Sequence, residues 1–320
     1  MREIKKSNVC VIGGAGFLGS HLVKYLIDER ECNVLVLDNL IAGHRKFIHP
    51  KAKFQWFDIT GSEDQLRKIF IANNIEYIFN YSAEPYIPVS FERPLHVFNI
   101  NAFAALKVMN AGQEAGAKAI LQVSSAEIYG KVDGKINEDD KVHPHSTYGS
   151  SKMAVDSLVQ VRWREAKTPA IAMRQFNCYG ENETHEYIIP VIIKQIAENR
   201  QCNEATIYLG NNSFRDFQYA GDAVRMATEL LEKGEFGEVY NMGSENGIKI
   251  YDLAYLIGKL MGLEKLNIVE DPKRIRPWEI WHLQSDNTKL YSLIKSRPEV
   301  SFEDGLMRTI NDYNNNGFVF

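Results

Sequence analysis

A glycine-rich turn near the amino end constrains the fold of this chain more than any other segment. The turn, GGAGFLG at residues 13–19, follows a short apolar run at residues 8–12 and directly precedes an amphipathic segment at residues 20–29. Strand, glycine turn and helix in this order form the context that a dinucleotide-binding fingerprint requires. The three spaced glycines would serve the tight turn, the close approach of backbone to a pyrophosphate and the packing of helix on strand, in the order Gly13, Gly16 and Gly19. We predict a pyrophosphate at the amino end of this helix, with a plain tight turn as the alternative.

An acidic residue at the end of the next apolar run indicates which dinucleotide is bound. Residues 33–37 read as the second strand and end in Asp38, about twenty residues beyond the turn. A carboxylate there would accept hydrogen bonds from the adenosine ribose and repel a 2′-phosphate, which favours NAD over NADP. His44 and Arg45 could instead favour NADP, or they could belong to a solvated loop.

The later apolar runs alternate with helical patterns. Further strands are predicted at residues 54–57, 77–80 and 119–123, and helices at 62–71 and 94–116. This alternation predicts an α/β fold with a Rossmann, doubly wound parallel sheet. Asp58 could contact the adenine or serve a turn. Asn99 and Asn101, on the long helix, read more simply as groups that satisfy the backbone in the core.

A tyrosine and a lysine four residues apart, Tyr148 and Lys152, are the predicted centre of the chemistry. The two share one helix face, and an ammonium group beside a phenol favours its ionised, basic form. Ser125 ends the fifth predicted strand, and Glu127 follows two residues later. Because ligands of open α/β sheets bind at the carboxyl ends of the strands, we expect all four side chains at one site. Taken alone, the Tyr-x-x-x-Lys spacing is equally typical of an exposed helical pair.

Composition and charge exclude several other classes of function. The 320 residues are 45% apolar and carry a formal net charge of −4 without a Lys/Arg cluster, which gives no electrostatic case for nucleic acid or anionic membrane. Four separate cysteines form neither a metal nor a redox pair and favour a reducing, cytoplasmic compartment. No apolar run approaches the roughly 18 residues of a membrane span. We therefore predict a cytoplasmic protein without a bound metal.

Seven sequence features, taken in order, resemble the extended short-chain dehydrogenase/reductase family of nucleotide-sugar epimerases and dehydratases. The glycine turn, Asp38, the Ser125 segment and the Tyr148/Lys152 pair are followed by RQFNCYG at residues 174–180, RDF at 215–217 and RPWE at 276–279. The resemblance spans roughly residues 9–289. It implies that the substrate diphosphate is held by Asn177, Arg215 and Arg276.

The resemblance also implies two lobes and a larger set of contacts. We expect an NAD-binding Rossmann domain at residues 1–175, to which later segments could return, and a smaller α/β lobe at residues 176–320 that mainly binds the nucleotide sugar. Besides Tyr148 and Lys152, the expected NAD contacts are Gly13, Gly16, Phe17, Leu18, Gly19, Asp38, Asn39, Asp58, Ile59, Ser82, Ala83 and Asn99. The expected substrate contacts also include Glu84, Ser125 and Ala126.

Glu127 favours one reaction of this family over the others. The family's reactions begin with oxidation at C4 of the sugar, and in 4,6-dehydratases a glutamate at this position then removes the C5 proton. Ala126 stands where dTDP-glucose dehydratases have an acid for the leaving hydroxyl, so the proton donor is unassigned. We therefore predict a 4,6-dehydratase, with a 4-epimerase as the alternative. A nucleotide-glucuronate decarboxylase and a non-catalytic NAD-binding protein are less favoured.

The family resemblance implies a homodimer as well. The helix at residues 94–116 and the helix that begins near Tyr148 would pack against their copies as a four-helix bundle. The apolar faces expected there, which could instead pack within one chain, comprise Val97, Ile100, Ala104, Val108, Val155 and Leu158.

Overall fold

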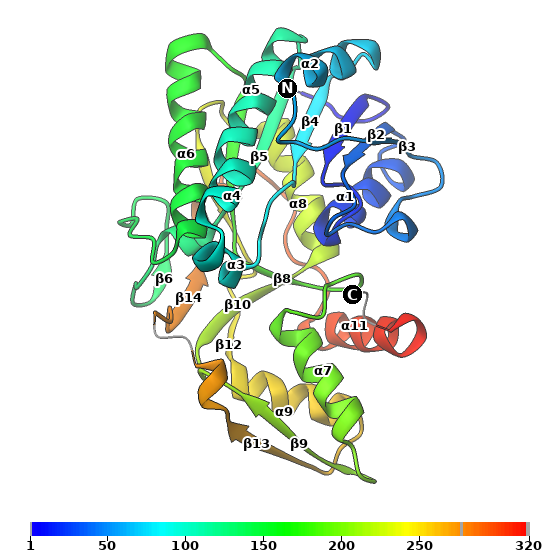
Figure 1. Cartoon of the computed structure of the whole chain (residues 1–320), viewed down its shortest axis with the longest axis vertical. Helices are drawn as coiled ribbons and strands as arrows, with labels where there is room; N and C mark the ends of the chain where they lie inside the picture. The colour runs from blue at the N-terminus through cyan, green and yellow to red at the C-terminus, as the bar shows by residue number, and fades with distance from the viewer. Residues whose placement is uncertain (1, 276–277, 318–320) are drawn as a thin grey trace.

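Seven parallel strands form the larger of the two lobes (Figure 1). The computed structural model describes residues 2–275 and 278–317. The strand order is β11-β7-β5-β4-β1-β2-β3. Both faces of this sheet are covered, so its central strands are buried and read as continuous apolar runs in the sequence. The strands are β1 (Asn8–Ile12), β2 (Asn33–Asp38), β3 (Lys53–Trp56), β4 (Tyr77–Asn80), β5 (Ala119–Ser125), β7 (Ala170–Gln175) and β11 (Val239–Met242).

Helices pack on the two faces of this sheet and close two apolar cores. One core lies under α1 (Phe17–Asp28) and α8 (Ala220–Lys233), with Leu22, Leu26 and Leu230 fully buried. The other lies under α2 (Glu63–Ala72), α5 (Ala104–Glu114) and α6 (Thr147–Ala166). Figure 1 shows α5 and α6 on one side of the strands and α1 and α8 on the other. The predicted doubly wound Rossmann sheet is confirmed.

The strand order reverses beside β1, and this reversal decides where a ligand can bind. From β1 the chain moves to β2 on one side, and later to β4 on the other. The connections therefore diverge at the carboxyl end of β1 and leave a crevice there. The glycine turn, residues 13–19, occupies this point.

The predicted long helix at residues 94–116 contains an irregular turn. It consists of α4 (Pro94–Phe98), a π-helical turn labelled η2 (Asn99–Phe103) and α5. Inside the turn, the Asn101 amide accepts from Glu84 N (2.9 Å) and donates to Glu84 O (3.2 Å) and Ser151 Oγ (3.0 Å). Asn101 thus satisfies backbone groups in the core, as predicted, while Asn99 lines a cavity at the carboxyl ends of the strands.

The smaller lobe is built mainly from the second half of the chain. A five-stranded sheet joins β6 (Lys135–Ile136), β8 (Asn177–Tyr179), β10 (Phe214–Tyr219), β12 (Gly247–Lys249) and β14 (His282–Ser285). A separate parallel pair joins β9 (Glu204–Leu209) and β13 (Lys265–Glu270). The apolar core of the smaller lobe is covered by α7 (Ile188–Asn199), α9 (Ile250–Leu260) and α11 (Phe302–Asn316). The short elements are η1 (Arg45–Phe47), α3 (Ile87–Glu92), η3 (Ala126–Ile128), η4 (Pro272–Arg274) and α10 (Thr288–Tyr291).

Two later segments, β11 and α8, return to the larger lobe. β11 pairs with β7, and α8 packs its apolar side chains into the core beside α1. Because β6 joins the smaller lobe before residue 175 and β11 and α8 return to the larger one after it, the division of the chain at residue 175 remains a proposal. Within residues 2–275 and 278–317, no helix has both the length and the apolar character that crossing a membrane requires.

The apolar residues predicted to face a second copy mostly face the interior of this one. Val97, Ala104, Val108 and Val155 are at most 1% exposed, while Ile100 and Leu158 pack on the core from its edge. The alternative of packing within one chain therefore holds for these side chains. Large apolar groups on the outside of the same helices are exposed instead: Leu95 (86%), Phe103 (57%) and Met153 (36%).

Candidate active site

A cavity of about 470 Å³ runs along the carboxyl ends of the parallel strands and is lined by residues of both lobes. It extends from the glycine turn to the end of β5 and the start of α6. The structure places most of the predicted site residues on its wall. They are Gly13, Gly16, Phe17, Leu18, Gly19, Asp38, Asn39, Asp58, Ile59, Ser82, Ala83, Glu84, Asn99, Ser125, Ala126, Glu127, Tyr148, Lys152 and Asn177.

The glycine turn leaves room for a ligand only where the fingerprint requires it. Gly13 has φ +77°, and a Cβ there would lie 2.8 Å from Ser82 N, so a side chain would be both strained and blocked. A Cβ on Gly19 would come within 2.0 Å of Gly13 O. A Cβ on Gly16 would meet only Gly13 O, at 3.3 Å, and would otherwise project into open space. This open side of Gly16, at the amino end of α1, fits the predicted pyrophosphate.

Asp38 is buried at the end of β2, and it also holds the backbone around it. Its carboxylate accepts hydrogen bonds from Ala15 N (3.0 Å) and Leu40 N (2.8 Å). The carboxylate lines the cavity with lone pairs to spare for ribose hydroxyls. His44 packs on Phe47, and Arg45 lies over the Phe54 ring at 5.0 Å. Neither is among the described residues that line the cavity, so the site fits NAD better than NADP.

Asp58 serves a turn, one of the two roles that its sequence position left open, and it also lines the cavity. One carboxylate oxygen accepts from Thr60 N (2.8 Å) and Thr60 Oγ1 (2.6 Å), and the other accepts from Asn39 Nδ2 (3.2 Å). The hydrogen bond from Thr60 is the main cause that lowers the pKa of Asp58 below its ordinary value. The aspartate therefore fixes a turn, and together with Asn39 it forms part of the cavity wall near Asp38.

Ser125, Tyr148 and Lys152 meet where β5 ends beside α6. The Ser125 hydroxyl is hydrogen-bonded to the Tyr148 hydroxyl. Lys152 Nζ donates to Val123 O (2.8 Å) and lies 5.9 Å from the centroid of the Tyr148 ring. Ser146 begins the helix by capping Gly149 N (3.0 Å), which fixes the first turn that carries the tyrosine. The expected constellation of hydroxyl, phenol and ammonium group is therefore assembled on rigid elements.

Burial dominates the ionisation of this pair. It raises the pKa of Tyr148 to about 12, while the hydrogen bond from Ser125 acts in the opposite direction. It also lowers the pKa of Lys152 to about 8, against the attraction of Asp156. The expectation that Lys152 makes the phenol more acidic is therefore outweighed here, because desolvation penalises both charged forms.

Two carboxyl groups lie beside Tyr148. Glu127 and Glu84 both raise the pKa of the phenol by their negative charge. Glu127 N donates to Ser125 Oγ (3.2 Å), which fixes the glutamate at the start of η3. Burial raises the pKa of Glu84 above its ordinary value. Ala126, between the serine and the glutamate, adds only a methyl group to the wall.

The predicted arginines are not brought to this cavity within the described residues. Arg215 is buried and forms an ion pair with Glu279, and its Nη1 donates to Phe214 O (3.0 Å). It is not among the described residues that line this cavity, so its contact with a phosphate stays a prediction. Its guanidinium is already neutralised by the glutamate. Arg276 lies outside the described residues.

A loop after β8 adds cavity residues that the sequence motifs did not identify. Glu183, Glu186 and Tyr187 line the wall opposite the strands' ends, and Gln175 ends β7 beside them. Their one signal was the polar run ENETHE at residues 181–186, directly after the glycine of the RQFNCYG motif. Its position next to a motif could have suggested a site, but polar loops are common and the run resembles no fingerprint.

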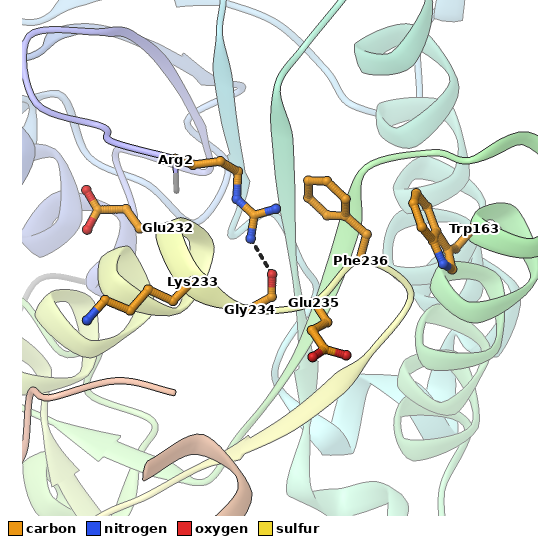
Figure 2. Close-up of a pocket in the computed structure, with 7 residues that line it drawn as sticks. All are labelled: Arg2, Trp163, Glu232, Lys233, Gly234, Glu235 and Phe236. Carbon is orange, nitrogen blue, oxygen red and sulfur yellow. Dashed lines mark hydrogen bonds between the residues drawn. The ribbon is translucent and has the colours of Figure 1, made fainter. Parts of the chain in front are cut away.

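A second hollow, of about 690 Å³, lies at the opposite ends of the strands (Figure 2). Figure 2 shows Arg2 reaching across it to the segment that follows α8. Arg2 donates to Leu231 O (2.9 Å) and Gly234 O and stacks on Phe236 at 4.1 Å. The arginine caps the carboxyl end of α8, which is a structural role. Among the described residues, no group of three or more His, Cys, Asp or Glu could hold a metal ion.

Comparison with known proteins identifies the family. Residues 10–309 match the family model described as GDP-mannose 4,6 dehydratase. A mouse protein named dTDP-D-glucose 4,6-dehydratase is 30% identical over 320 residues, covering 96% of this chain and 89% of the relative.

Solved structures of two enzymes share the fold over almost their whole length. UDP-glucose 4-epimerase of Thermotoga maritima, with UDP-glucose, has a TM-score of 0.89 at 27% identity and covers 96% of this chain and 99% of its own. A dTDP-glucose 4,6-dehydratase of Streptomyces venezuelae, with NAD bound, has a TM-score of 0.86 at 26% identity and covers 97% of each chain. NAD is thus the cofactor of this fold, and the open face of Gly16 and the buried Asp38 carboxylate fit it. The chain belongs to the GDP-mannose 4,6-dehydratase family of extended short-chain dehydrogenases/reductases, whose members here are NAD-dependent nucleotide-sugar dehydratases and epimerases.

Proposed function

We propose that this chain is a nucleotide-sugar 4,6-dehydratase that acts through a 4-keto intermediate. The observation that carries the proposal is the position of Glu127, which lines the cavity together with Tyr148 and whose negative charge raises the pKa of the phenol. A base next to the phenol is needed only if a second carbon–hydrogen bond is broken after C4 has been oxidised. The relatives named dTDP-D-glucose 4,6-dehydratase support this choice.

Three residues prepare the first step. Tyr148 accepts the proton of the C4 hydroxyl, Ser125 holds the same oxygen by a hydrogen bond, and Lys152 supplies positive charge near the phenol. Bound NAD supplies the hydride acceptor at the start of the cycle and the hydride donor at its end. The tyrosine is buried, so the proton moves between groups that are shielded from bulk water.

The second step needs a base and an acid, and we assign them to two glutamates. The C4 ketone acidifies the C5 proton, which Glu127 removes. The C6 hydroxyl then leaves as water after taking a proton, and Ala126 cannot donate one. Glu84 lies on the same wall, acts electrostatically on Tyr148 and has a raised pKa, which favours its protonated form. We therefore assign the leaving-group proton to Glu84.

Replacement of Glu127 by glutamine tests the proposed reaction. With a panel of nucleoside diphosphate hexoses in deuterated water, we expect the wild type to release a dehydrated product with deuterium at C5. Glu127→Gln should still show the absorbance of reduced nicotinamide on substrate addition, but it should neither exchange C5 nor lose water. An epimerase would keep much of its turnover in this variant, with no deuterium at C5, and that result would overturn the dehydratase assignment.

Glu84→Gln separates the acid from the base in the same assay. Because Glu127 is intact in this variant, C5 exchange should continue while water loss falls about 10²-fold or more. Loss of exchange together with dehydration would show that Glu84 serves substrate binding instead of the elimination. The two variants have the same size and charge change, so each is the control for the other.

The alternatives fit the cavity less well. A nucleotide-glucuronate decarboxylase must bind a sugar carboxylate, yet Lys152 is the only lysine or arginine among the described residues that line the cavity, and Glu84, Glu127, Glu183 and Glu186 share that wall. A non-catalytic NAD-binding protein has no need of a serine, a phenol and a lysine in contact. A 4-epimerase is favoured by the close fit to the Thermotoga maritima enzyme and by a relative named UDP-glucose 4-epimerase, and it remains the second candidate.

The substrate is proposed to enter as a nucleoside diphosphate sugar. The neighbouring structures contain such ligands or their parts, and Asn177 lies on the cavity wall where the family resemblance places a diphosphate contact. Arg215 forms an ion pair with Glu279. The identity of the nucleotide is to be determined with the substrate panel.

We also propose a homodimer and a cytoplasmic location. The exposed residues Leu95, Phe103 and Met153 lie on α4, η2 and α6, the helices through which a bundle between copies would form. A cytoplasmic location is supported by the cysteines, since all four are free thiols.

A further inference from the structure

The loop after β8 carries a buried carboxyl group that the proposed reaction does not use. Glu183 is 5% exposed and lies on the cavity wall. One side of its carboxyl is hydrogen-bonded to the backbone of Gly180, and Oε2 is buried without a hydrogen-bond partner. Buried polar atoms in native proteins nearly always have a partner, so an unpartnered oxygen at a cavity indicates a contact to a ligand.

The loop is held against the helix that begins at the glycine turn. Asn182 Nδ2 donates to Ser20 Oγ (3.2 Å), and His21 Nε2 is hydrogen-bonded to Glu181 O (2.8 Å). A further bond runs from Asn182 N to Asp312 Oδ2 (3.1 Å) on α11. Because Ser20 and His21 stand in the first turns of α1, the loop lies close to the pyrophosphate position.

Glu183 shares the cavity wall with the glycine turn and with Tyr148. Its carboxyl acts electrostatically on Cys178 and on Tyr187. The charge of Tyr148 raises the pKa of Tyr187, and the charge of Cys178 raises the pKa of Tyr81. The backbone of Tyr81 is only 2.9 Å from where a Cβ on Gly13 would lie. A dinucleotide that extends from the glycine turn to Tyr148 must lay its nicotinamide half along this part of the wall.

The protonation state of Glu183 defines which ligand group it suits. Burial raises the pKa of Glu183 well above its ordinary value, and a neutral thiol and a neutral phenol are its ionisable neighbours. A neutral carboxylic acid presents one O–H donor and one carbonyl acceptor side by side. A primary carboxamide presents the complementary pair, a carbonyl acceptor and an N–H donor.

We propose that the Glu183 carboxyl, whose Oε2 is buried without a partner at the cavity wall, binds the carboxamide group of the nicotinamide ring of NAD. The proposal rests on the proposed function for the position of the ring, which must lie beside Tyr148 for hydride transfer. Two hydrogen bonds would then fix the ring about its bond to the ribose and so determine which face meets the sugar. Glu183 is a cofactor-binding residue in this arrangement and takes no part in proton transfer.

The test measures the preference of the protein for NAD over ADP-ribose, which lacks only the nicotinamide ring. Purified holoenzyme is equilibrated with mixtures of the two nucleotides, freed of unbound ligand and denatured, and the released nucleotides are quantified. The ratio is measured within one protein sample, so a variant's overall stability does not enter it. Product formation is not needed, and the outcome therefore stands apart from the dehydratase assignment.

We expect Glu183→Ala to reduce the preference for NAD by about tenfold, the worth of one to two hydrogen bonds. Glu183→Gln, which keeps a donor and an acceptor, should retain the wild-type preference within about threefold. If the alanine variant does not fold, Glu183→Leu fills a similar volume, and its preference for NAD over ADP-ribose is measured instead. An unchanged preference in the alanine or leucine variant, or an equal loss for the glutamine variant, would overturn the proposal.

Discussion

Replacing the buried lysine Lys152 should make the protein more stable. Lys152 is 3% exposed, and burial lowers its pKa from 10.5 to about 8. A depression of this size corresponds to about 3 kcal/mol of folding free energy lost, at neutral pH, by keeping an ammonium group in the interior. Lys152→Met removes that charge with little change in length. It also removes the hydrogen bond to Val123 O, which costs about 1 kcal/mol.

The net gain in the stability of Lys152→Met over the wild type at pH 7 is therefore about 2 kcal/mol. This gain should decrease as the pH rises. Below pH 8 the lysine is protonated in both states, and the whole penalty is present. Between pH 8 and 10.5 the unfolded chain binds more protons than the folded one, so the wild type becomes more stable as pH rises. Above that window both states are neutral, and the advantage of the methionine variant should disappear.

The assay is the thermal midpoint of nucleotide-free protein at pH 7 and at pH 10. For a chain of this length, about 2 kcal/mol raises the midpoint by roughly 4 °C. Lys131→Met, at an exposed loop position, is the control and should leave both midpoints unchanged. A midpoint for Lys152→Met that is lower than the wild type at pH 7, or a gain that persists at pH 10, would refute the role assigned to desolvation.

Two further predictions concern the phenol and the surface. Tyr148→Phe should keep the fold and bound NAD but lose about 10²–10⁴-fold in turnover, measured as steady-state product formation; near-normal turnover would exclude Tyr148 as the proton acceptor. Leu95→Glu should convert the proposed homodimer to a monomer, as measured by light scattering at micromolar concentration. Ile71→Glu, at an exposed apolar position on α2, is the control and should leave the dimer intact. A wild type that is already monomeric would contradict the dimer.

The sequence predicted the fold well because its strongest patterns are local. β1 and β4 have the bounds that their apolar runs indicated, and α1 begins at the glycine turn. β11 was not placed in the sheet from sequence, since Val239–Met242 reads like any short apolar run and only its pairing with β7 assigns it. The π-helical turn at Asn99–Phe103 was equally hidden, because it preserves the apolar spacing of a continuous helix.

The candidate site also contains features that local motifs predict and features that depend on distant partners or on burial. Ser125, Tyr148 and Lys152 were predicted to lie together, and they do, because each belongs to a motif on one strand end or one helix face. The ion pair between Arg215 and Glu279 was not predicted, because it joins segments 64 residues apart and no spacing rule reports such a partner. Glu183 escaped notice for a related reason, since its importance lies in being buried, and a glutamate in a polar loop is ordinarily exposed.

The choice between dehydratase and epimerase cannot come from overall likeness, and the comparisons themselves show why. A relative named dTDP-D-glucose 4,6-dehydratase and a relative named UDP-glucose 4-epimerase are each 30% identical to this chain, and solved structures of both kinds superimpose over nearly its whole length. We propose that the scaffold serves the step that both reactions share, oxidation at C4, through Ser125, Tyr148 and Lys152. The fate of the 4-ketose then depends on whether a base can reach C5. An epimerase needs only to rotate the 4-keto sugar within the site. For such an enzyme a carboxylate near the phenol would raise the pKa of Tyr148 without benefit. That electrostatic cost is reasonable only if Glu127 removes a proton, and this is the physical argument for the dehydratase.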